Sequence, residues 1–339
     1  REFGKMKFDV VIGNPPYQQN ANGESTRSEP IYHLFMDLAY QLAPVVSLIT
    51  PARFLFNAGQ TPKAWNRKML DDPHLKVVMY EQDSSKIFPN TDIKGGVAIT
   101  YRDVNQDFGE IGVFTTYEAL RSIVKKVSKK EHAQESMDKY VSSRGNFRFT
   151  KKFFIDHPDA KDRLGKGTGN MIVSNVFEKL DKIFLIEKPK NTMGGYLRFL
   201  GRINNERAYR YIRTDYVQSN SYLDVYKIFI PKANGRGILG EKLSMPIIGK
   251  PNEGATDTFV SIGCFQSFEE AEALLKYIKT KFLRVLLGIK KVTQDNSQSV
   301  WDLVPIQNFT DHSDIDWSQP IPAIDRQLYA KYGLTEEEI

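Results

Sequence analysis

The chain has 339 residues, of which 41% are hydrophobic and 26% charged, so it contains enough apolar material for about two ordinary domains. Its longest apolar runs are far shorter than the roughly 20 residues of a membrane span, and its single cysteine, Cys264, excludes an internal disulfide framework, so we expect a reducing, cytoplasmic compartment. A net charge of +6 permits a polyanionic partner, although many proteins of this charge bind no nucleic acid.

Apolar runs that fit strands alternate with helical patterns through about residue 135. The run at 8–13 reads as a strand buried on both faces of a parallel sheet, and strand, helix, strand implies a right-handed crossover. This alternation favours an open α/β sheet. We predict strands at 8–13, 45–49, 75–80 and 96–101 and helices at 31–42 and 64–70.

The pattern changes after a basic helical stretch at 120–130. Short β-like runs separated by Gly, Pro and Asn turns then favour a separate α+β domain. Residues 268–287 predict one long helix, with apolar residues at i, i+3 and i+4, acidic residues early and basic residues late. We therefore predict three parts: 1–135, 136–310, and a docking arm with a short helix at 311–339.

The tetrapeptide Asn14-Pro15-Pro16-Tyr17 directly follows the first predicted strand. When a methyl group is transferred to an exocyclic amine of a nucleobase, the Asn14 amide oxygen and the Pro15 carbonyl can accept its two N–H groups, and the prolines fix where those acceptors point. Acceptors already placed for the tetrahedral nitrogen stabilise the transition state. Tyr17 offers a flat face for a base that has left its duplex. Alternatively, the tetrapeptide is merely a turn.

The segment KFDVVIGNPPY resembles motif IV of gamma-class adenine-specific DNA methyltransferases. Later segments resemble this family in the same order: VVSLITPARFL resembles the next strand, and DSSKIFPNTDIKGGVAITYRD resembles the segment with a second stacking aromatic residue, here Phe88. Segments from YKIFIPKANGRGILGE to the Asp-Trp tail resemble the target-recognition half of type II restriction-modification methyltransferases. The resemblance implies the C-terminal half of a Rossmann-like methyltransferase sheet followed by a separate α+β target-recognition domain.

The resemblance implies methyl transfer from S-adenosylmethionine to the amino group of a flipped adenine in a specific sequence of double-stranded DNA. Gamma-class enzymes carry their cofactor loop upstream of this tetrapeptide, so we expect the chain to be a fragment, with most of the cofactor site and any fused nuclease outside it. The Gly-rich stretch at 164–170 follows a polar segment rather than a strand, and we interpret it as a surface loop. The implied catalytic residues are Asn14, Pro15, Pro16 and Tyr17, and the implied stacking residues are Tyr17 and Phe88.

Arginine and aromatic residues interleave between residues 194 and 217, which indicates a surface that binds phosphates or reads guanine edges. A basic face over an aromatic core is the alternative. A Gly-rich turn at 232–236 and a polar loop at 290–298 carry further donors, although either can be a plain turn. The predicted DNA-contacting residues are Arg198, Arg202, Arg207, Arg210, Lys232, Asn234, Arg236, Lys291 and Gln294.

The five histidines lack zinc-site spacing, and we predict no metal site. Cys264 lacks the Pro-Cys context of cytosine ring methylation, and we expect it to be a small buried residue. Two other functions stay open. One is a non-catalytic DNA specificity module, and the other is a methyltransferase that acts on RNA or on protein glutamine. The large C-terminal domain favours DNA as the substrate.

Overall fold

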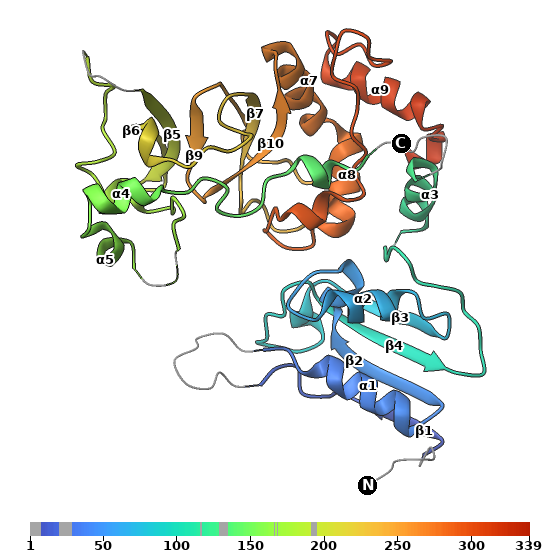
Figure 1. Ribbon diagram of the computed structural model, residues 1–339. Helices are drawn as coiled ribbons and strands as arrows, with labels where there is room; N and C mark the ends of the chain where they lie inside the picture. The colour runs from blue at the N-terminus through green and yellow to red at the C-terminus, as the bar shows by residue number, and fades with distance from the viewer. Residues whose placement is uncertain are drawn as a thin grey trace. The chain divides into compact units, whose positions relative to one another are not determined.

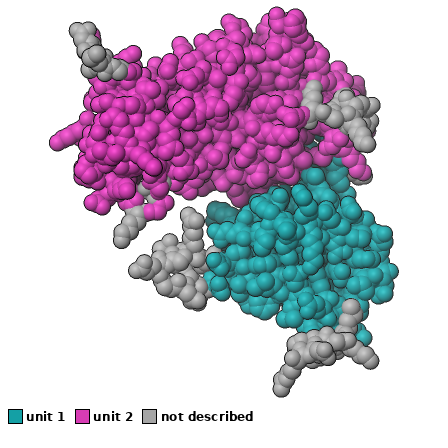
Figure 2. Space-filling model, viewed as in Figure 1, with its two compact units in different colours: residues 1–123 teal, residues 124–339 magenta. Residues whose placement is uncertain are grey.

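The computed structural model describes residues 8–19, 29–115, 117–128, 135–165, 167, 169–190 and 195–339. The chain divides into two compact units, residues 1–123 and 124–339, coloured separately in Figure 2. The predicted boundary at residue 135 falls inside the second unit, and the tail at 311–339 belongs to that unit as well. Helix α3, Glu118–Val127, spans the division, and the end of the basic stretch predicted at 120–130 lies outside the described residues.

Unit 1 contains a four-stranded sheet in the order β1-β2-β4-β3. Strand β1 pairs in parallel with β2, with α1 between them in the chain, whereas β4 lies antiparallel between β2 and β3 (Figure 1). The strands are Val10–Gly13 (β1), Val45–Pro51 (β2), Leu75–Glu81 (β3) and Val97–Asp103 (β4), and the helices are Tyr32–Leu42 (α1) and Lys63–Leu70 (α2). The short 3₁₀ helices η1 and η2 span Ala52–Phe56 and Ser84–Lys86.

Strand β1 contains no buried side chain in the described structure, so the prediction that it is buried on both faces is wrong. Val10 and Ile12 are 48% and 79% exposed, whereas Val46 and Leu48 in the neighbouring β2 are buried. An apolar run indicates a strand because its residues favour the extended backbone. Burial depends on the segments that pack over the two faces of the sheet, which the run itself does not encode.

Aromatic rings from three elements pack together in the core of unit 1. Tyr32 of α1, Phe54 of η1 and Trp65 of α2 are all buried. The Phe54 and Trp65 ring centroids lie 5.4 Å apart, and the Trp65 indole N–H donates to the Asp37 carboxylate over 3.0 Å. This cluster fixes the start of α1 and the segment after β2, which are the two elements that flank the Asn14 segment.

Unit 2 contains two three-stranded sheets, ordered β10-β7-β8 and β6-β5-β9. Its strands are Tyr196–Ile203 (β5), Glu206–Arg213 (β6), Tyr226–Pro231 (β7), Ile247–Gly249 (β8), Glu253–Ala255 (β9) and Phe259–Phe265 (β10). Its helices are Lys151–Asp156 (α4), Ala160–Leu164 (α5), Val176–Lys179 (α6), Phe268–Lys279 (α7), Lys281–Lys290 (α8) and Ile321–Lys331 (α9). An α/β unit followed by a separate α+β unit confirms the predicted fold class.

The predicted single helix at 268–287 is two helices that meet at Thr280, so the prediction is wrong at this residue. Thr280 has φ −63° and ψ 151°, and its hydroxyl accepts the Leu283 backbone N–H over 3.2 Å. The Asp325 carboxylate of α9 accepts the backbone N–H groups of Lys281 and Phe282 at 3.0 and 2.9 Å. These acceptors satisfy amides that a new helix start leaves open.

Cys264 is exposed near the end of β10, where the pairing with β7 shifts between Ile262 and Phe265, so the expectation of a buried cysteine is wrong. Among the residues that the structure describes, no helix combines the length and apolar character needed to cross a bilayer. The same part of the chain brings together no group of three or more His, Cys, Asp and Glu side chains that could hold a metal ion.

Candidate active site and nucleic-acid-binding face

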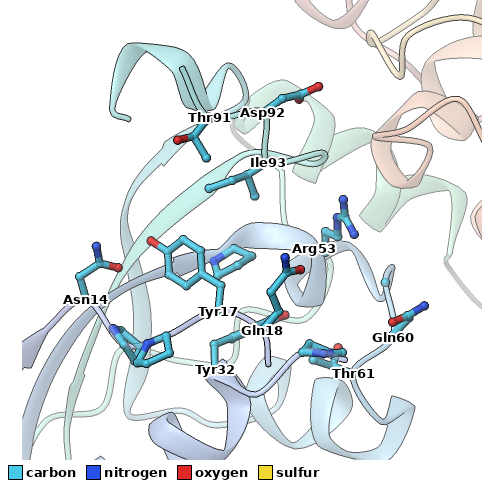
Figure 3. Close-up of a pocket in the computed structure, with 15 residues that line it drawn as sticks. Asn14, Tyr17, Gln18, Tyr32, Arg53, Gln60, Thr61, Thr91, Asp92 and Ile93 are labelled. Carbon is cyan, nitrogen blue, oxygen red and sulfur yellow. The ribbon is translucent and has the colours of Figure 1, made fainter. Parts of the chain in front are cut away.

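The Asn14-Pro15-Pro16-Tyr17 segment directly follows the end of β1, and its side chains line one cavity (Figure 3). At its start, Gly13 is paired with Leu48 of β2. At its end, the Tyr17 carbonyl accepts the Ile31 backbone N–H over 3.0 Å, and Gln18 forms an antiparallel bridge with Pro30. The sheet and the start of α1 therefore hold the tetrapeptide from both sides, and the two prolines restrict the backbone between them.

The tetrapeptide lines a cavity of about 670 Å³, which lies in the size range of small-molecule sites. In Figure 3, Asn14 and Arg53 lie on opposite sides of the Tyr17 ring. The other lining residues are Gln18, Pro30, Tyr32, Pro51, Gly59, Gln60, Thr61, Thr91, Asp92 and Ile93. The cavity is open to solvent and larger than a purine ring, so none of the described residues closes it over the tetrapeptide.

The polar groups of Asn14 and Tyr17 are unengaged within the described structure. The Asn14 side chain is exposed, and no hydrogen bond joins it to another described residue. The Tyr17 hydroxyl is buried, and no described residue bonds to it. Burial raises the pKa of Tyr17 to about 12, so the phenol stays neutral at physiological pH. Both side chains are therefore available to a ligand in the cavity.

Phe88 contacts Tyr17 but is not among the residues that line the cavity. The two ring centroids lie 6.3 Å apart with planes at 70°, which is an edge-to-face arrangement. Such a contact fixes the orientation of the Tyr17 ring. The predicted role of Phe88 as a second stacking face stays a prediction.

Arg53 is a cavity residue that the sequence analysis did not single out. It belongs to η1, directly after β2, and its Nε donates to the Lys94 carbonyl. The sequence signal was a lone arginine within an otherwise apolar stretch, Pro51 to Phe56, at the end of a strand. The direction of its side chain depends on Gly59 and Gly95, because the side chain passes between these two glycines.

The Gly-rich stretch at 164–170 follows helix α5 rather than a strand. Gly165, Gly167 and Gly169 line a separate cavity of about 290 Å³. A Gly-rich cofactor loop joins a strand to a helix. Neither this loop nor the described lining of the Asn14 cavity supplies that arrangement, so these residues do not fit an S-adenosylmethionine site.

Pairing between β5 and β6 sorts the predicted arginines onto two faces. Arg198 opposes Tyr211, and Arg202 opposes Arg207, so Arg198, Arg202 and Arg207 share one face. Arg210 opposes Phe199, a fully buried core residue, and its guanidinium lies 5.9 Å from the Phe177 ring. Arg210 therefore belongs to the core-facing side of the sheet. It does not share a DNA-contacting surface with Arg198, Arg202 and Arg207.

The face that carries Arg198, Arg202 and Arg207, here called the arginine face, has excess positive charge. The Arg198 guanidinium stacks 3.8 Å above the Tyr209 ring, and its Nε lies 3.3 Å from Glu253. Arg202 and Arg207 face each other across the strands, and neither pairs with a carboxylate of the described residues. Burial and the nearby Arg202 lower the pKa of Arg207. The Arg202 Nε is buried without a described partner. An anion between these two arginines would relieve their repulsion.

Two residues predicted to contact DNA, Asn234 and Lys291, are buried and bind the protein itself, so the structure contradicts their predicted role. Lys291 is 2% exposed, and its Nζ donates to the Glu241 carboxylate and to the Asn234 carbonyl. The Asn234 amide oxygen accepts the Ser244 backbone N–H over 2.8 Å. They hold the turn between β7 and β8. Of the other predicted contacts in these loops, Arg236 and Gln294 are exposed and Lys232 is half-buried.

Comparison with known proteins finds similarity in the N-terminal part of the chain. Residues 1–88 match the family described as Eco57I restriction-modification methylase. The predicted methylase resemblance is confirmed. An uncharacterized adenine-specific methylase of Mycoplasma pneumoniae (strain ATCC 29342 / M129 / Subtype 1) is 36% identical over 98 residues. The aligned part covers 28% of this chain and 23% of that methylase, so the match spans about a quarter of its curated relative.

Two solved structures are distantly similar to the chain. The type IIG restriction endonuclease BpuSI is 12% identical, with 89% of this chain and 44% of that chain covered at a TM-score of 0.30. The type IIL restriction-modification enzyme MmeI, solved in complex with DNA, is 10% identical, with 96% and 55% covered at a TM-score of 0.39. Similarities at this level assign neither a fold nor a function.

Proposed function

We propose that this chain binds an adenine flipped out of double-stranded DNA in the Asn14 cavity and presents its exocyclic amine for methylation. The chain would act on adenines within a specific DNA sequence, as part of a cytoplasmic restriction-modification enzyme. The observation that carries the proposal is the open cavity of about 670 Å³ beside an unengaged Asn14 side chain and the Tyr17 ring. Confirmed similarity of residues 1–88 to a restriction-modification methylase supports the same reaction.

Asn14 and Pro15 hold the amine in this proposal. The Asn14 amide oxygen and the Pro15 carbonyl oxygen accept its two N–H groups, which turns the nitrogen lone pair out of conjugation with the purine ring. Because the sheet and α1 fix the segment at both ends, the acceptors need little reorganisation as the nitrogen becomes tetrahedral. The Tyr17 ring carries the base, and stacking of this kind contributes roughly 1–3 kcal/mol per base. The surplus proton of the methylated nitrogen passes to water.

S-adenosylmethionine is the methyl donor that we propose, and it would supply an electrophilic methyl group. The described residues do not fit its binding site, so none of them receives a role in holding it. The steps assigned to this chain are binding of the base, orientation of the amine and exclusion of water from the stacked face.

The arginine face is the part of unit 2 that we propose to contact the DNA backbone. Phosphate contacts position a protein on DNA, and their number sets the salt dependence of binding. Arg202 and Arg207, neither of which pairs with a described carboxylate, support this role most directly, because their mutual repulsion in the free protein would be relieved by a phosphate between them. Arg198 also holds Glu253, so its contribution is partly structural.

To test this proposal, the protein is expressed in a host without adenine methylation, and N6-methyladenine is mapped in the host genome. We expect methylation at one short sequence. Asn14→Ala should reduce it by orders of magnitude while DNA binding is retained, and Asn14→Asp, which keeps an acceptor oxygen, should lose less. Full methylation by Asn14→Ala would refute the role of Asn14. Methyl label found on RNA or protein would instead support another acceptor, and DNA binding without any transfer would support a specificity module.

A further inference from the structure

We propose that Arg53 binds a phosphate group of the nucleotide whose base occupies the Asn14 cavity. This inference rests on the proposed function, because it requires a nucleotide there. It adds a positioning residue on the opposite side of the cavity from Asn14 (Figure 3).

Two glycines from separate loops shape the path of the Arg53 side chain. A Cβ at Gly95 would lie 2.8 Å from the Arg53 Cγ, and a Cβ at Gly59 would lie 3.2 Å from its Cδ. Both glycines have left-handed φ angles, +86° for Gly95 and +83° for Gly59, which other residues rarely adopt. The side chain therefore occupies a channel that only glycine leaves open on both sides.

The hydrogen bond from Nε to the Lys94 carbonyl fixes the guanidinium at the end of this channel. No carboxylate among the described residues forms an ion pair with Arg53, so this part of the chain leaves its charge without a partner carboxylate. An arginine held in this way loses little conformational freedom when it binds a ligand. Its remaining N–H groups form the fork that matches two oxygens of a phosphate.

The position of Arg53 in the cavity selects a phosphate as the ligand. If the base amine lies at Asn14 with the ring on Tyr17, the sugar and its phosphates extend away from Asn14, toward Arg53 and Gln60. Asp92 also lines the cavity, but its carboxylate pairs with Lys94 over 2.5 Å, so its repulsion of a phosphate is reduced. The Tyr32 hydroxyl, which belongs to another lining residue, stays neutral because burial raises its pKa to about 12.

The experiment compares binding of deoxyadenosine, deoxyadenosine 5′-monophosphate and deoxyadenosine 3′-monophosphate to the full chain, observed by NMR. We expect one of the two nucleotides to bind roughly tenfold more tightly than the nucleoside, as a charge-assisted pair would provide. Arg53→Ala should remove this difference between the nucleotide and the nucleoside. Arg53→Lys should retain part of it. Arg67→Ala, which removes an exposed arginine of α2 that does not line the cavity, is the matched control and should change nothing.

The outcomes separate this inference from the proposed function. Equal binding of nucleoside and both nucleotides to the unaltered chain would overturn the role of Arg53 and keep the adenine site. An equal loss of affinity for all three ligands in Arg53→Ala would also overturn it. Failure of deoxyadenosine itself to bind would refute the adenine site and the inference with it.

Discussion

The Tyr17 ring meets the Phe88 ring edge-on, with the two centroids 6.3 Å apart and the planes at 70°. Phe88 therefore supports the side of Tyr17, and only Tyr17 reaches the cavity. From this arrangement we predict that the two aromatic residues contribute unequally to the proposed base binding, although the sequence predicts both as stacking residues.

We expect Tyr17→Ala to weaken deoxyadenosine binding about tenfold to a hundredfold, because a stacking face of roughly 1–3 kcal/mol is lost. Phe88→Ala should weaken it less, because only the roughly 0.5–1.5 kcal/mol edge contact that orients Tyr17 is removed. NMR titration of both variants measures the two effects, and Phe88→Leu is the control that retains bulk. Losses of equal size would instead indicate that Phe88 stacks directly on the base.

Replacing Arg202 by Gln should have opposite effects on binding and stability. Binding to a mixed-sequence duplex should weaken, and the slope of log affinity against log salt should fall by about 1, because a phosphate contact is lost. The free energy of unfolding should rise by roughly 0.2–1 kcal/mol, because the repulsion from Arg207 is removed. Fluorescence anisotropy at several salt concentrations and urea denaturation measure these changes. Arg210→Gln, on the core-facing side of the same sheet, is the control. An equal change of salt slope in both variants would contradict the arginine face.

Lys291→Met should unfold the turn between β7 and β8 more readily without altering how DNA is bound. The buried Lys291 ammonium balances Glu241, and loss of one partner of a buried pair costs about 3–5 kcal/mol. Urea denaturation measures the loss, and the double variant Lys291→Met with Glu241→Gln should recover part of it. If the Lys291→Met protein is stable and its DNA affinity depends less steeply on salt, the original prediction that Lys291 contacts DNA is supported.

The lowered pKa of Lys227 should make the stability of the protein depend on pH. Burial lowers the pKa of Lys227 to about 8, and its Nζ donates to backbone carbonyls of Val225 and Lys250. The unfolded chain keeps a lysine pKa of about 10.4, so it binds more protons than the folded protein between these values. Stability should therefore rise with pH across this window, by up to about 3 kcal/mol. Urea denaturation at several pH values compares the protein with Lys227→Met, and parallel curves would contradict the lowered pKa.

Local patterns in the sequence predict most of the strands and helices of unit 1. The apolar runs of β2, β3 and β4 and the helical spacing of α1 encode local conformation, and the structure contains each of them close to the predicted residues. The antiparallel direction of β4 was not predicted, because pairing direction depends on contacts between distant segments. The break at Thr280 was missed for a similar reason, since it is stabilised by Asp325, which belongs to another helix.

The sequence predicts those residues of the candidate site that are neighbours in the chain, and it does not predict those whose position depends on distant segments. Asn14 and Tyr17 stand together in one tetrapeptide, and the structure brings both to one cavity. Arg53 was missed because its position depends on Gly95, which lies beyond α2, β3 and η2 in the chain. For the β5 and β6 arginines, the sequence predicts that they interleave with aromatic residues, but only the strand register decides which face each occupies.

The exposed rim of β1 has a practical consequence for work with this chain in solution. Within the described structure β1 pairs on one side only, and Val10 and Ile12 are largely solvent-exposed. An unpaired apolar strand edge recruits edges of other molecules, so self-association should increase with protein concentration. Ile12→Lys, which places a charge on that rim two residues before Asn14, should suppress the aggregation and allow binding measurements at the concentrations that NMR needs.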